Sequence, residues 1–166
     1  MNGRLAHRAL GALIALVLLA GLLALAAAPT GATTPEAAVP SDARISARRD
    51  VGPAVAFLTV RRSELSVVIA YHRPKGWFVA PSPAVPRSVD VSWTATGGDG
   101  PVPPLAAAYG HAGGGTVRVT WADGRVDTAG VGTDGLWLVV RRGAVPLSRV
   151  DVLGSDGSVV SSPAAP

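Results

Sequence analysis

The sequence predicts an all-β fold, a small antiparallel β-sandwich or barrel preceded by one N-terminal transmembrane or signal helix. Three observations lead to this fold class: one long uncharged run near the N-terminus, a period of two in the apolar residues after residue 50, and Asp-Gly pairs between the resulting segments. No helical period of any length follows residue 50, so an α/β enzyme fold is not expected. The chain has 166 residues, which suits one domain with short extensions.

Residues 9–28 form the uncharged run and contain no polar side chain. A helix of this length rises about 30 Å, the thickness of the hydrocarbon core of a bilayer. Arg4 and Arg8 precede the run and no Lys or Arg follows it until Arg44, so the positive-inside rule places residues 1–8 in the cytoplasm and the C-terminal part outside. The length favours an uncleaved single-pass anchor in the cell membrane. Small-residue patterns nearby leave cleavage of a signal peptide, and hence secretion, as the alternative.

Residues 29–50 are rich in Pro, Thr, Ala and charged side chains and have no sustained apolar period. Three prolines interrupt any helix. We therefore expect a flexible linker that lifts the following domain off the membrane, with a short helix around residues 41–49 as an alternative. At the other end of the chain, residues 163–166 are expected to form a disordered tail.

Apolar and polar residues alternate along several segments of residues 51–162, as in strands with one buried face. Val117, Val119 and Trp121 share one predicted face, while Arg118 lies on the solvent side. Similar alternation places Val89, Val91, Trp93 and Ala95 on one face, and Val150 and Val152 on another, opposite Arg149 and Asp151. More continuously apolar runs, typical of central strands or strands buried on both faces, occur at residues 54–60, 65–72, 77–80 and 136–140.

Turn residues separate these segments. Asp123-Gly124 and Asp156-Gly157 each lie between two predicted strands, and glycine supplies the positive φ that two-residue hairpins require. Strands at this spacing with turns between them are typical of a β-sandwich or small barrel, which we expect as one extracytoplasmic domain over residues 51–162.

The stretch TVRVTWADGRVDTAGV, followed by DGLWLVV and then SRVDVLGSDGSVV, resembles small secreted or membrane-anchored β-domain proteins of high-GC bacteria. Through its Asp-Gly turn and its Asp-Gly-aromatic strand it also resembles the carboxypeptidase-regulatory-like and transthyretin-like β-sandwich modules. The resemblance is confined to roughly the last third of the chain. It implies a β-sandwich, and it supplies no catalytic residue to carry over.

Candidate catalytic groups are few. The absence of cysteine excludes a disulfide scaffold, a thiol enzyme and cysteine-based metal centres. His72 and His111 fall at the ends of predicted strands, and neither belongs to a His-x-His or His-Glu-x-x-His pattern. We therefore predict no catalytic, cofactor-binding or metal-ligating residue. A serine–histidine–aspartate site could be assembled around His111 or His72 only by the fold.

Aspartate and tryptophan side chains offer two further possibilities. Calcium or paired acid–base chemistry would draw on Asp123, Asp127, Asp134, Asp151 and Asp156, but three of these directly precede glycine, as is typical of turns. An exposed aromatic row for sugar or peptide binding would draw on Trp77, Trp93, Trp121 and Trp137. We expect Trp93 and Trp121 to fill the core instead, in phase with their neighbouring valines.

The charge balance gives no indication that the protein binds nucleic acid. The net charge is +4, and half of it comes from Arg4 and Arg8 before the apolar run, so the exported part is almost neutral. We therefore expect a membrane-tethered extracytoplasmic β-domain that binds an envelope component or a partner protein, is not an enzyme and needs no cofactor. The alternative is an exported hydrolase with its site around His111 or His72.

Overall fold

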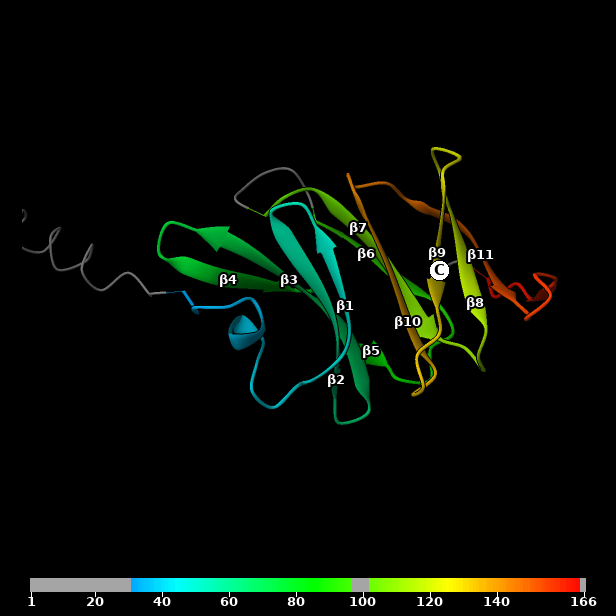
Figure 1. Cartoon of the computed structure of the whole chain (residues 1–166), viewed down its shortest axis with the longest axis horizontal. Coiled ribbons are helices and arrows are strands. Elements are labelled where there is room, and N and C mark those ends of the chain that lie inside the picture. Colours follow the sequence, from blue (N-terminus) through cyan, green and yellow to red (C-terminus); the bar gives the residue numbers. More distant parts are fainter. Residues whose placement is uncertain (1–30, 97–101, 165–166) are drawn as a thin grey trace, which may run out of the picture. The chain divides into compact units, whose positions relative to one another are not determined.

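The computed structural model of the chain describes residues 31–96 and 102–164, which form an all-β, antiparallel unit in three sheets (Figure 1). The all-β prediction is confirmed. The predicted apolar helix at residues 9–28 lies outside the described residues. Within the described ranges the only helical element is the 3-10 turn η1 (Glu36–Ala38), and no helix is long and apolar enough to cross a membrane.

All neighbouring strands in the three sheets run antiparallel. Sheet A has the order β1 (Arg44–Val51), β2 (Ala54–Arg61), β3 (Glu64–Arg73), β4 (Gly76–Pro81), and the short β5 (Val85–Pro86) pairs with β3. Sheet B has the order β10 (Leu136–Arg142), β7 (Leu105–His111), β6 (Ser92–Thr96). Sheet C has the order β12 (Val159–Ser161), β11 (Leu147–Leu153), β8 (Thr116–Trp121), β9 (Val126–Gly130).

Sheet B packs between the other two, so its strands β7 and β10 are buried on both faces (Figure 1). On β10, Leu136 and Leu138 face sheet A, whereas Trp137 and Val139 face sheet C. Successive strand residues point to opposite faces, which is why a continuously apolar run suits a central layer. The prediction that residues 136–140 are buried on both sides is confirmed, and the domain has three layers of sheet where a sandwich has two.

The expected flexible linker over residues 29–50 is wrong for its described part. Residues 44–50 belong to β1, which pairs with β2 along its whole length, and no helix forms around residues 41–49. Upstream of β1, Val39 and Ala43 pack on the outer face of sheet A together with Phe57 of β2. The prolines interrupt a long helix but do not prevent an edge strand further along the chain. Because β2 is apolar on both faces, its outer face must also be buried, and the segment before β1 buries it.

The predicted inward face of β8 is confirmed. Val117 and Val119 are buried, and the Trp121 side chain is 1% exposed. The corresponding prediction for β6 holds only for Val91, just before the strand, because Val89 and Trp93 are half-buried and Ala95 is exposed. β6 lies at the edge of sheet B opposite β10, and none of its residues is buried, whereas β10 packs against both neighbouring sheets.

Candidate functional site

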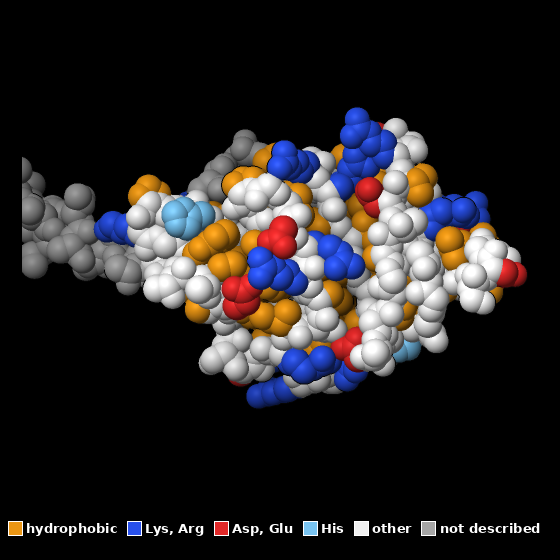
Figure 2. Space-filling model, in the orientation of Figure 1, with side chains coloured by type: hydrophobic (Ala, Val, Ile, Leu, Met, Phe, Trp, Pro, Cys, Tyr) orange, Lys and Arg blue, Asp and Glu red, His pale blue; other side chains and the backbone are white. Residues whose placement is uncertain are grey.

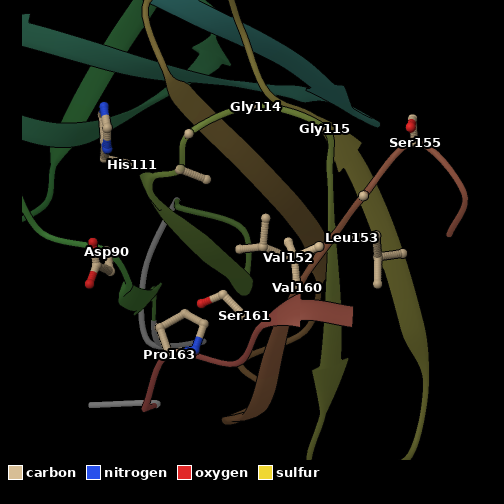
Figure 3. A pocket seen from close by; sticks show the side chains of 13 residues that line it. Asp90, His111, Gly114, Gly115, Val152, Leu153, Ser155, Val160, Ser161 and Pro163 are labelled. Atoms are coloured by element: carbon tan, nitrogen blue, oxygen red, sulfur yellow. The ribbon is translucent and has the colours of Figure 1, made fainter. Parts of the chain in front are cut away.

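The structure places the two candidate histidines on different sheets. His72 lies near the tip of the β3–β4 hairpin, exposed, with its ring edge-on to Trp77 at a centroid distance of 5.3 Å. His111 ends β7 and lines a hollow of about 520 Å³ (Figure 3). Of the two histidines, His111 is the one that lines this hollow.

This hollow is surrounded by Asp90 before β6, by the loop from β7 to β8, and by the β11–β12 hairpin with Pro163 (Figure 3). Its apolar lining comes from Ala112, Val152, Leu153, Val160 and Pro163. Its polar lining comes from Asp90, His111, Ser155 and Ser161, together with the backbone of Gly113, Gly114 and Gly115. An apolar floor with a few polar groups at its edge is the usual composition of a binding site.

A close backbone approach brings Asp90 to this hollow. A Cβ atom added to Gly110 would lie 2.1 Å from the carbonyl oxygen of Asp90, so only glycine fits at this position of β7. The next residue, His111, donates its backbone N–H to the carbonyl of Val89 at 2.9 Å. The segment before β6 is thereby held against the end of β7, and Asp90 and His111 share one wall.

The side chains do not form a catalytic triad. The His111 ring lies against the β9–β10 turn, because a Cβ added to Gly135 would be 2.5 Å from its Nε2 atom. Figure 3 shows the side chains of His111, Asp90 and Ser161 well separated around the hollow. Among the described residues no hydrogen bond joins these three side chains.

Beside the hollow lies an edge strand with apolar side chains in solvent. β12 is the last strand of sheet C and pairs only with β11 among the described strands. Val159 is exposed, and Val160, which also lines the hollow, is 64% exposed. The chain after β12 is held by Ser162, whose hydroxyl donates a hydrogen bond to Asp151 on β11.

Asp151 is the one carboxylate in the described ranges that is almost fully buried, with a side chain 2% exposed. Arg118 of β8 and Arg149 of β11 each donate to it at 2.8 Å, and the Ser162 hydroxyl does so at 2.7 Å. Burial alone would raise the pKa of this carboxyl, but the hydrogen bonds from Ser162, Arg118 and Arg149 outweigh burial and lower the pKa to about 2. Asp151 is thus a charged structural anchor for β8, β11 and the chain after β12.

The other four aspartates singled out from the sequence also have structural partners. Asp127 accepts a hydrogen bond from the Trp121 indole at 2.7 Å, and Asp123 pairs with Arg141 of β10 at 3.3 Å. Arg44 and Ser46 of β1 both donate to Asp134, and Asp156 accepts from Ser158 in its own turn. Among the described residues no three histidine or acidic side chains are grouped to hold a metal ion.

The four tryptophans do not form an exposed row. Trp121 and Trp137 are buried in the core between sheets B and C, and Trp77 and Trp93 are half-buried on sheets A and B. The prediction that Trp121 fills the core is confirmed. The hollow itself had no signal in the sequence, because the β7–β8 loop meets the β11–β12 hairpin only through the non-local pairing of β8 with β11.

Comparison with protein-family models, with curated proteins and with solved structures found no match to this chain.

Proposed function

We propose that the chain is a membrane-tethered extracytoplasmic binding module, anchored by residues 9–28, whose β-domain holds an extended segment of a partner protein along β12. The uncharged run and the arginines before it support the tether and its orientation. The edge strand and the hollow support binding of a peptide segment, and no cofactor enters the proposal.

One observation carries this proposal: the edge strand β12 exposes two valines and carries neither a charged side chain nor a proline. Exposed edges in proteins are generally blocked by charged side chains, proline, a bulge or a covering segment. β12 (Val159–Ser161) is short and its pairing with β11 includes a bulge, but it contains no charge and no proline, and both of its valines are exposed. An added strand would form backbone hydrogen bonds with it, which is the recurring mode of recognition of extended peptides.

The hollow supplies a place for side chains of the added strand. Val160 and Ser161 belong both to β12 and to the wall of the hollow, so a segment paired with β12 passes beside it. Side chains of a strand alternate between two faces, so every second one can enter the hollow and contact its apolar lining. We therefore expect the bound partner segment to have an apolar side chain at a position that faces the hollow, with small or polar residues on either side of it.

The hydrolase alternative has one observation in its favour, since His111, Asp90 and Ser161 line the same hollow. The missing hydrogen bonds between them, and the His111 ring packed on Gly135, make binding the better interpretation.

Photo-crosslinking in intact cells tests the proposed binding edge. The full chain carries a photoreactive amino acid at Val160 or, as the matched control, at Val126, an exposed valine of β9 that is 52% exposed and does not line the hollow. We expect a discrete protein adduct from position 160 and none from position 126. Adding Val159→Lys, which places a charge on the edge, should abolish the adduct. Equal adducts at both positions, or an adduct that survives Val159→Lys, would contradict strand addition at β12.

A further inference from the structure

We propose that the tip of the β3–β4 hairpin, residues 71–78, is a docking surface for an anionic lipid bilayer and seats the β-domain directly on the membrane. This inference rests on the proposed tether at residues 9–28. It replaces the picture of a domain lifted off the membrane by a long linker.

The backbone ties the start of the described chain to the hairpin tip. Gly31 donates its N–H to the carbonyl of Lys75 at 2.9 Å. Ala32 and Trp77 exchange two backbone hydrogen bonds, each 2.9 Å, and so form an isolated antiparallel bridge at the outer edge of β4. Residue 31 is therefore fixed beside the turn of the hairpin.

Chain length then limits how far the tip can lie from the anchor. The uncharged run ends at residue 28, three residues before Gly31. Three residues span at most about 11 Å even when fully extended. The headgroup layer on each side of the hydrocarbon core is about 5–8 Å thick, so the tip is held at or next to the headgroups.

The side chains of the tip have the chemistry of the membrane interface. The guanidinium of Arg73 lies 5.4 Å from the ring centre of Tyr71 and 5.6 Å from that of Phe78. On the other face of the hairpin, His72 and Trp77 form the edge-on pair already described. Aromatic rings with polar atoms are enriched at headgroup level, and Lys and Arg extend their charged ends to that level from apolar stems.

The charge of the tip suits an anionic surface. Residues 71–78 include Arg73 and Lys75, both exposed, and contain no acidic residue. Figure 2 shows hydrophobic, basic and histidine side chains gathered at the end of the domain that carries this hairpin. A basic residue close to an anionic bilayer contributes about a fivefold change in membrane partitioning.

The absence of cysteine allows a clean labelling test. The full chain with Pro74→Cys is placed in lipid nanodiscs of phosphatidylcholine and phosphatidylglycerol, and the rate of reaction with a bulky water-soluble maleimide is compared with the rate in detergent. Ser155→Cys, in the exposed β11–β12 turn, is the matched control. We expect position 74 to react at least about tenfold more slowly in nanodiscs, as partitioning of two basic residues implies, and position 155 to react equally fast in both.

A charge variant tests the class of lipid. Arg73→Gln with Lys75→Gln should restore fast labelling of position 74, whereas Arg125→Gln, at a side chain 76% exposed in the β8–β9 turn, should change nothing. Replacing phosphatidylglycerol by phosphatidylcholine should have the same effect as the double glutamine variant. Protection that persists in both cases would overturn recognition of anionic lipid.

The remaining outcomes separate the docking surface from the tether. If the chain enters nanodiscs but position 74 reacts as fast there as in detergent, the docking surface is wrong and the tether stands. If the chain does not enter nanodiscs at all, the tether fails, and the docking surface fails with it.

Discussion

Replacing Trp121 by alanine is expected to lower the free energy of unfolding by about 3–5 kcal/mol, the range for truncating a large buried aromatic side chain. Trp121 is 1% exposed and packs in the core between sheets B and C. Its indole N–H is bound by Asp127, and the Arg141 guanidinium lies 5.8 Å from its ring centre. The substitution therefore opens a cavity and also leaves two polar partners without the ring that joins them.

Urea denaturation of a chain that begins at Gly31, the start of the compact β-unit, measures this loss. Trp93→Ala is the matched control, because Trp93 is half-buried on the edge strand β6. It should cost less than half as much as Trp121→Ala. If both substitutions destabilise the unit equally, the core between sheets B and C has been assigned wrongly.

Asp151→Ala is expected to cost about 3 kcal/mol, the lower end of the range for breaking a buried ion pair. The lower end applies because Arg118 and Arg149 are partly exposed and can be hydrated once the carboxylate is gone. The same denaturation experiment measures it, with Asp123→Ala as the control. Asp123 is 38% exposed and its removal should cost under about 1 kcal/mol. Equal losses would show that burial of Asp151 does not matter.

Asp151 also makes a defined contribution to the pH dependence of stability. Its pKa is about 2 in the folded chain against an ordinary value of 3.8, so the unfolded chain binds more protons between these values. The stabilisation is complete above the ordinary pKa and is lost as the pH falls toward 2. Asp151→Asn should lack this component, so the difference in unfolding free energy between the two chains should shrink over that interval. A difference that stays constant would contradict the lowered pKa.

The sequence predicted the face of Arg118 correctly but not its role. Alternation along residues 116–121 places Arg118 on the outer face, where it lies, 38% exposed. What alternation does not contain is the register of β8 against β11, which sets Arg118 opposite Asp151. Alternation with Val150 and Val152 places Asp151 on the solvent face, but it is buried because Arg118, Arg149 and the chain at Ser162 cover it. The alternation of apolar and polar residues within one strand does not show which residue of a distant strand will lie opposite.

Other differences have the same origin. The all-β class, the inward face of β8 and the two-sided burial of β10 follow from local patterns of apolar residues. The third layer does not follow from local patterns, because it depends on sheets A and C packing on opposite faces of β7 and β10. β1 was missed because its apolar alternation is weak, with Ile45 and Ala47 separated by a β-bulge. The hollow was missed because the end of β7 and the β11–β12 hairpin, which form its walls, meet only in the folded chain.

The central claim is that residues 9–28 hold the β-domain outside the membrane, and labelling of the full chain with Ser155→Cys in intact bacterial cells tests it most directly. The account predicts that a membrane-impermeant maleimide labels position 155 in intact cells, and that the labelled chain stays in the membrane pellet after a carbonate wash. Labelling that requires lysis of the cells would contradict the orientation, and a labelled chain that leaves the pellet with the wash would contradict the anchor.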